Sequence, residues 1–300
     1  MRISGPDFVA AISNSGAMGM MSSVMFPAEA EFREAIRRAK SLTSKPFGIN
    51  LSFLPALNII DNEMYVRVIL EEDCVTVVET SGYRPPRELL ARLQAGGVKT
   101  IHKCVSVRHA LSAQEMGVDA VTVFGTEGGG HIGELGLTSM TLVPAACDAL
   151  DIPVLAAGGI VDGRGFLAAR SLGAEGVVMG TRMLLTEECP IHYRLKESLL
   201  AATEMDTITV LHSLNNAIRT WRNSAALKTA ELEAGQSDVG EILSMVAGEK
   251  AQRMITLGDV DAGVIACGEG IGIVRQVRPV AEVIRDIVHE AEAIRQRLAG

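Results

Sequence analysis

The chain has 300 residues, of which 48% are hydrophobic and 21% are charged, and it carries a formal net charge of −8. This length and composition can bury a large core, whereas the acidic excess argues against nucleic acid or an anionic membrane as the main partner. The five cysteines form no CxxC pair, which is typical of reduced thiols and not of a disulfide framework. No apolar run reaches membrane-spanning length, so we expect a cytoplasmic protein that does not enter the membrane.

Predicted strands and helices alternate through the first 179 residues, after an initial helix over 7–14. Strands are predicted over 18–22, 47–53, 75–79, 100–105, 120–124, 154–157 and 176–179. Helices are predicted over 28–42, 63–71, 87–95, 107–116, 142–150 and 166–172. Apolar strands that alternate with helices predict a parallel sheet with both faces covered.

This alternation predicts an α/β fold, a (β/α)8 TIM-type barrel, over residues 1–186. Such a barrel uses eight strands and seven are predicted, so either residues 1–3 supply a short first strand or that strand is missing. Helices predicted over 193–203, 209–234 and 240–254 make residues 187–257 a helical lid subdomain. A turn, a glycine-rich apolar segment and a helix over 279–298 make residues 258–300 a C-terminal segment that returns to the barrel.

Two glycine turns lie at the ends of consecutive predicted strands. Gly158 and Gly159 follow the strand over 154–157, and Gly180 and Thr181 follow the next one. Turns at one edge of a parallel sheet present backbone N–H groups that can hold a phosphate, and in TIM barrels such a site follows the seventh and eighth strands. The sequence therefore predicts a phosphate site here.

Three polar residues lie near the ends of other predicted strands. Asn50 and Ser52 need hydrogen-bond partners, which either a ligand or the neighbouring backbone would supply. Lys103 lies in an otherwise apolar strand, where it would pair with an anionic ligand or a carboxylate, or form a Schiff base.

His131 follows three glycines in the loop after the strand over 120–124. A glycine loop can pass close to a planar ligand, and an imidazole titrates near neutrality, so His131 is a candidate catalytic base. The alternative is a solvated loop histidine. We interpret four other histidines as structural: His102, His109, His192 and His212. No HxH, HExxH or carboxylate cluster indicates a metal, so we predict none.

Several segments together resemble the nitronate monooxygenase family: KPFGINLSFLP, KTIHKCVSVRHAL, GTEGGGHIGE, IPVLAAGGIVDGRG, GAEGVVMGTRML and ECPIH. This family, also called 2-nitropropane dioxygenase, includes FMN-dependent NADH:quinone reductases and enoyl-ACP reductase II. The resemblance runs from about Asp7 onward and implies a (β/α)8 barrel that holds FMN. It assigns the flavin phosphate to Gly158, Gly159, Gly180 and Thr181. It assigns the flavin ring and ribityl chain to Asn50, Ser52 and Lys103, with Gly129 and Gly130 beside the flavin and His131 as the catalytic or substrate-binding group.

Two departures from the family pattern stand out. Relatives begin with a strand that ends in a QGGM-like turn, and this sequence begins just after that point, which we expect to affect barrel closure and flavin affinity. Glu269 places a charge where some relatives have none, which we expect to affect substrate access.

The leading interpretation is an FMN-dependent oxidoreductase that oxidises alkyl nitronates with oxygen. An FMN-dependent NAD(P)H:quinone or enoyl-thioester reductase is the first alternative. A flavin-free Schiff-base lyase that uses Lys103 and a non-catalytic ligand-binding relative are the others. The expected partners are small molecules (a nitronate, a quinone or NAD(P)H), and a homodimer is compatible with the sequence.

Overall fold

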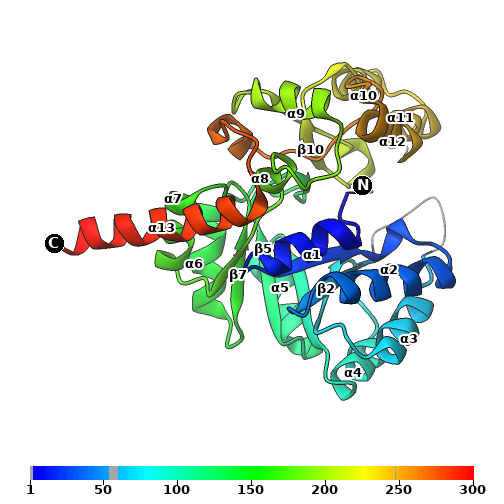
Figure 1. Cartoon of the computed structure of the whole chain (residues 1–300). Coiled ribbons are helices and arrows are strands. Elements are labelled where there is room, and N and C mark those ends of the chain that lie inside the picture. The colour runs from blue at the N-terminus through cyan, green and yellow to red at the C-terminus, as the bar shows by residue number, and fades with distance from the viewer. Residues whose placement is uncertain (1–2, 54–59, 247) are drawn as a thin grey trace.

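The computed structural model of the chain describes residues 3–53, 60–246 and 248–300. Its main sheet contains parallel strands in the order β1-β2-β3-β4-β5-β7-β8. Their bounds are Gly19–Ser22 (β1), Phe47–Phe53 (β2), Val77–Gly82 (β3), Lys99–Cys104 (β4), Ala120–Phe124 (β5), Val154–Ala157 (β7) and Gly176–Val178 (β8). The sheet is curled into a half-barrel with helices around it, as Figure 1 shows, so the predicted TIM-type α/β fold is confirmed.

One helix precedes the first strand and the others follow the strands, and these helices pack on the outer side of the sheet. They are α1 (Pro6–Asn14), α2 (Glu29–Leu42), α3 (Asn62–Glu72), α4 (Arg87–Ala95), α5 (Val107–Met116), α6 (Ser139–Ala149) and α7 (Gly163–Ser171). Helix α2 illustrates why they form, because its buried residues Phe32, Ala35, Ile36 and Ala39 recur at helical spacing. Side-chain caps begin several of these helices; Ser106, for example, accepts a hydrogen bond from the N–H of His109 at the start of α5.

Successive residues of each strand face opposite sides of the sheet, which separates the core from the polar side chains. Ile49 and Leu51 of β2 are fully buried in the core under the helices, while Asn50 between them faces the inner side. On β4, Cys104 lies in the helix-side core and Lys103 faces inward. Polar side chains from several strands therefore meet on the inner side.

The chain after β8 forms a mixed unit and not a purely helical one. Its elements are α8 (Thr181–Leu184), α9 (Tyr193–Leu200), β9 (Thr207–Val210), β10 (Ile218–Trp221), α10 (Ser224–Ala234), α11 (Val239–Met245) and α12 (Gly248–Leu257). The predicted helix over 209–234 is wrong in its first part, where β9 and β10 pair antiparallel. Leu211 and Asn215 between them adopt left-handed backbone (φ 68° and 49°), which ends regular structure at both points.

The loop after β5 joins this second sheet through β6 (Gly130–His131). Strand β6 pairs antiparallel with β10, with His131 opposite Ile218, and the N–H of Ile132 donates to the carbonyl of Ala217 at 3.2 Å. The loop that carries His131 is thus part of a three-stranded sheet, β6-β10-β9.

The chain ends in α13 (Val280–Ala299), which follows the short 3-10 helix Glu269–Ile273. Figure 1 shows α13 lying along α7, where a Glu290 carboxylate oxygen accepts from the N–H of Gly163 at 2.8 Å. Helix α13 therefore packs against a helix of the half-barrel. No helix in the described ranges is both long enough and apolar enough to span a bilayer.

Candidate functional site

Side chains from four neighbouring strands meet around one buried carboxylate on the inner side of the sheet. Glu79 of β3 is 5% exposed. One of its oxygens, Oε2, accepts from Asn50 Nδ2 at 2.9 Å and lies 3.3 Å from Lys103 Nζ. The other, Oε1, accepts from the hydroxyl of Thr122 at 3.3 Å. The sequence analysis allowed Lys103 to pair with an anionic ligand or a carboxylate, or to form a Schiff base. In the structure Lys103 pairs with the Glu79 carboxylate.

Sequence reasoning missed Glu79, although a signal was present. The residue directly follows the β-branched run 75–78 inside a strand, and a buried carboxylate needs partners that compensate its charge. The same test that selected Lys103 would have selected Glu79. Together with Asn50 and Thr122, they show that the inner side of the sheet is polar from the middle of β2, β3 and β5 to the carboxyl end of β4.

Ser52 extends this polar surface along β2. It stands opposite Ser81 of β3 in the register, and its carbonyl oxygen accepts from Asn62 Nδ2 at 3.0 Å. Asn50 Nδ2 also lies 3.5 Å from Ser81 Oγ. Ser52 therefore lies near the carboxyl end of β2, where TIM-barrel sites lie, and Asn50 lies in the middle of the strand on the same inner side.

The two predicted glycine turns follow the neighbouring strands β7 and β8. Gly158 has φ of 106°, and a Cβ there would lie 2.9 Å from the carbonyl oxygen of Gly125, so glycine is required by conformation and packing. Gly159 also has positive φ, 71°, but is exposed. Gly180 differs from both: its φ is −111°, and a Cβ there would meet no atom within 4 Å. Nothing in the described protein therefore requires glycine at position 180.

The backbone donors of these turns are available to a ligand. The described residues supply no hydrogen-bond acceptor to the N–H groups of Gly159, Gly180 and Thr181. The Thr181 hydroxyl oxygen accepts from the N–H of Gly268 at 2.9 Å, which holds the second turn in place. Exposed N–H donors beside open space fit a phosphate group.

The glycine loop before His131 is packed tightly against the C-terminal segment. A Cβ on Gly129 would lie 2.6 Å from the backbone nitrogen of Cys267, so protein packing alone explains that glycine. Gly130 has φ of 105° and would meet only Ala266. The geometry of Gly129 therefore needs no ligand to account for it.

His131 presents an uncharged imidazole near Lys103. Its side chain is exposed and has no hydrogen-bond partner among the described residues. Protein atoms nevertheless surround the ring closely enough that desolvation, together with the charge of Lys103, lowers its pKa to about 4. At neutral pH the ring can accept a proton or a hydrogen bond.

An arginine from β10 holds the loop after β5. Arg219 donates from Nε to the carbonyl of Thr126 at 2.8 Å, and its Nη1 lies 3.1 Å from Glu269 Oε1. The N–H of Glu269 in turn donates to the carbonyl of Glu127 at 2.9 Å. Glu269, which departs from the family pattern, therefore helps to hold the His131 loop against the C-terminal segment.

Two other histidines have structural partners. His212 Nδ1 lies 2.8 Å from Glu134 Oε2, and the other oxygen of that carboxylate accepts from the N–H of Ala217. His192 Nδ1 accepts from the N–H of Arg194 at the start of α9. Both agree with the structural interpretation.

Comparison with known proteins gives relatives across the whole chain. The profile of the nitronate monooxygenase family matches residues 1–290. A protein of Rhodococcus jostii named as (3aS,4S,5R,7aS)-5-hydroxy-7a-methyl-1-oxo-octahydro-1H-indene-4-carboxyl-CoA dehydrogenase is 40% identical over 205 residues, which are 68% of this chain and 56% of that protein. A probable nitronate monooxygenase of Staphylococcus haemolyticus is 32% identical over 67% of each chain.

A solved structure is similar as well. FabK from Thermotoga maritima is 32% identical, with a TM-score of 0.91 over 99% of this chain and 92% of that one. The family profile covers both the half-barrel and the mixed unit that follows it, including the polar cluster, the glycine turns and His131. This chain belongs to the nitronate monooxygenase family and is an oxidoreductase of that family.

Proposed function

We propose that this chain is an FMN-dependent oxidoreductase that oxidises alkyl nitronates with oxygen. The observation that carries the proposal is Gly180, an exposed glycine with an ordinary φ whose missing side chain leaves open space beside free N–H groups. A phosphate fills such a space and uses such donors. The family match adds the expectation of flavin chemistry.

Residues of this chain fit the cofactor in two places. The turns after β7 and β8 would hold the phosphate through Gly158, Gly159, Gly180 and Thr181. The inner polar side chains Asn50, Ser52 and Lys103 would face the ribityl chain and the ring. The glycine turns, Ser52 and Lys103 lie at or near the carboxyl ends of parallel strands, which is where TIM barrels hold their ligands, and Asn50 lies deeper along β2 on the same side.

Bound FMN would supply the electron transfer that no protein side chain here provides. Lys103, whose charge is balanced by Glu79, would stabilise negative charge on the ligands in front of it. His131 is uncharged at neutral pH and would accept a proton from a carbon acid, or hydrogen-bond to a nitronate oxygen. Arg219 and Glu269 would keep that imidazole in place by fixing the loop before it.

A second candidate is an FMN-dependent reductase of enoyl thioesters or quinones. The relative that is 40% identical is named for a carboxyl-CoA substrate, which is a thioester, and this favours the candidate. The Schiff-base lyase is less well supported, because the Lys103 ammonium is engaged by Glu79 whereas a Schiff base needs the free amine. The last alternative is a chain that binds flavin but catalyses no reaction. Activity measurements on the flavin-loaded chain would identify it.

The test begins with the visible absorbance of the purified chain after incubation with FMN, followed by anaerobic addition of propyl-nitronate, NADH, NADPH and a short enoyl-CoA in turn. We expect one FMN per chain, reduction by the nitronate, and oxygen consumption when air is admitted. Reduction by NADH or NADPH followed by reoxidation with the enoyl-CoA would establish the second candidate instead. Failure to bind FMN would overturn both.

A further inference from the structure

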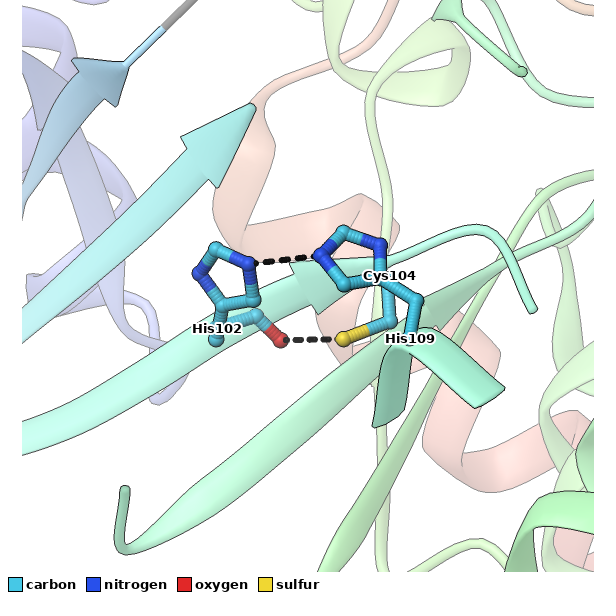
Figure 2. Close-up of side chains that lie close together, drawn as sticks. All are labelled: His102, Cys104 and His109. Carbon is cyan, nitrogen blue, oxygen red and sulfur yellow. Dashed lines mark hydrogen bonds between the residues drawn. The ribbon is translucent and has the colours of Figure 1, made fainter. Parts of the chain in front are cut away.

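A cluster of three potential metal ligands lies on the other side of β4 from the candidate active site. His102 and Cys104 alternate with Lys103 along the strand, so they face the helices while Lys103 faces inward. His109 comes from the first turn of α5 and points at His102, as Figure 2 shows. The two Nε2 atoms are 2.9 Å apart, and one ring nitrogen of each histidine and the Cys104 sulfur all lie within 4.8 Å of one another.

We propose that His102, Cys104 and His109 form a binding site for a soft metal ion, and that Cu⁺ is the ion that fits best. Imidazole and thiolate are the ligands that copper and zinc prefer in proteins. The prediction of no metal from the sequence rested on the absence of familiar histidine spacings, and it overlooked a cysteine two residues after a histidine.

The hydrogen bonds around His102 direct a nitrogen lone pair into the cluster. The Thr80 hydroxyl lies 3.2 Å from the carbonyl of Ile101 and 2.7 Å from His102 Nδ1. When this hydroxyl donates to the carbonyl, it accepts from Nδ1–H, which leaves the lone pair on His102 Nε2. A second partner that fixes the ring and its tautomer in this way is typical of metal-bound histidines.

Both imidazoles are uncharged at neutral pH, as metal ligands must be. Desolvation, together with the neighbouring His109, lowers the pKa of His102 to about 4, and desolvation also lowers the pKa of His109. Burial raises the pKa of the Cys104 thiol, so this group is protonated in the metal-free chain. Binding of a cation would form one metal–sulfur and two metal–nitrogen bonds, release the thiol proton, and move the His109 proton from Nε2 to Nδ1.

Charge and ligand number favour Cu⁺ over Zn²⁺. His102 and Cys104 are fully buried in a mainly apolar core, where a charged complex is costly. One thiolate with Cu⁺ makes a neutral complex that three ligands complete, whereas Zn²⁺ would keep a positive charge and require a fourth ligand.

Metal binding requires the two Nε2 atoms to move slightly apart, and His109 is the residue that can move. Metal–imidazole bonds of about 2.0 Å set two ligating nitrogens of a trigonal site roughly 3.5 Å apart. The present 2.9 Å separation must therefore widen. His109 is only half-buried and lies at a helix start, so it can shift while β4 stays in place.

The test titrates the reduced, metal-free full-length chain with Cu⁺ under anaerobic conditions against a chromophoric Cu⁺ chelator. We expect one tightly held Cu⁺ per chain, and X-ray absorption of the loaded wild-type chain should show one sulfur and two imidazole nitrogens. Cys104→Ser and His109→Asn should each abolish tight binding, and Thr80→Val should weaken it by about 10–100-fold. Cys147→Ser and His192→Asn are matched controls that should bind normally.

Circular dichroism and the melting temperature of each variant establish that it is folded, and the X-ray absorption result does not depend on any variant. Absence of stoichiometric Cu⁺ binding by the wild-type chain would overturn the proposal. So would a sulfur-free coordination, unchanged binding in both Cys104→Ser and His109→Asn, or tight binding of Zn²⁺ without Cu⁺.

Discussion

Glu79 and Lys103 form an ion pair across neighbouring strands, and the two side chains differ in how far they are exposed to solvent. The Glu79 side chain is 6% exposed and the Lys103 side chain is 27% exposed, with 3.3 Å between Oε2 and Nζ. Water can therefore solvate the ammonium in part but hardly reaches the carboxylate. The carboxylate depends on the ammonium more than the ammonium depends on the carboxylate.

Lys103→Met should therefore destabilise the fold more than Glu79→Gln. The first change leaves a buried carboxylate without its counter-charge, at a cost of up to about 3–5 kcal/mol. The second leaves a partly solvated lysine and keeps a polar group beside Asn50 and Thr122. Denaturant unfolding of both variants and of the double variant measures the free energies, and the double variant should be more stable than Lys103→Met alone. Equal and additive losses would contradict this account of the pair.

Gly180→Val should release FMN without harming the fold. Its side chain would enter a space that no protein atom occupies, so the melting temperature should stay close to that of the parent chain. The same space would hold the phosphate, and loss of one charge-assisted contact is worth about 1.5–3 kcal/mol. Flavin fluorescence titration should show FMN affinity at least about tenfold weaker. Gly248→Val, at another open glycine, is the control. Full flavin content in folded Gly180→Val would remove this turn from the phosphate site.

His131→Ala should separate the two candidate reactions. Proton transfer by a positioned side chain contributes about 10²–10⁴-fold, so turnover of a neutral nitroalkane, a carbon acid that must first lose its α-proton, should fall within that range. An alkyl nitronate has already lost that proton, so its turnover should fall less, through loss of the hydrogen bond from His131. Hydride transfer from NAD(P)H needs no base, so flavin reduction by that route should change little. FMN content should be unchanged, because the phosphate donors lie on other loops. Parent rates with every substrate would exclude His131 from the mechanism.

The pH dependence of nitronate turnover should reflect the low pKa of His131. The neutral ring is the active form, and it is protonated only as the pH falls through about 4 instead of the ordinary 6.5. We therefore expect kcat/KM to stay level from pH 8 down to pH 5 with respect to this group. An acid limb near pH 6.5 that disappears in His131→Gln would show that the ring titrates normally.

Arg219→Met should loosen the loop before His131, and Glu269→Gln should do so less. Arg219 is 13% exposed at its side chain and also contacts Thr126 and Thr207, so its loss removes several contacts, whereas Glu269 is 41% exposed. Hydrogen exchange over residues 125–131 should quicken in Arg219→Met, with a rise in KM. If exchange in that loop is equal in both variants and the parent, Arg219 does not hold the loop.

The seven parallel strands could be predicted because short segments with buried apolar residues alternate regularly with helical segments along the chain. Strands β2 and β5 coincide with their predictions, because their helix-facing residues are apolar and buried, namely Ile49, Leu51, Val121 and Val123. Asn50 and Lys103 could be found for the same reason, because a polar residue in such a segment is conspicuous.

The region after β8 could not be predicted as well, because its strands are short, half-buried and antiparallel. Thr207–Val210 is rich in β-branched residues, but this local preference was outweighed by apolar spacing that also suits a helix. The pairing of β6 with β10 could not be predicted either. Gly130–His131 has no strand pattern of its own, and it adopts its conformation through contacts with residues that are distant in the sequence. The His102–Cys104–His109 cluster likewise becomes visible only when β4 and α5 are packed together.

The pairing of His131 with Ile218 also sets an order of assembly during synthesis. All seven strands of the half-barrel leave the ribosome before β10 does, so the sheet and the turn after β7 can form while the segment that carries His131 still lacks its partner strand. The turn after β8 also waits for a later residue, because the N–H of Gly268 holds Thr181, so the nascent chain would complete both the phosphate turns and the alignment of the imidazole only after the half-barrel has been synthesised. Long-range contacts of this kind are slow to form, because the intervening chain must first be ordered.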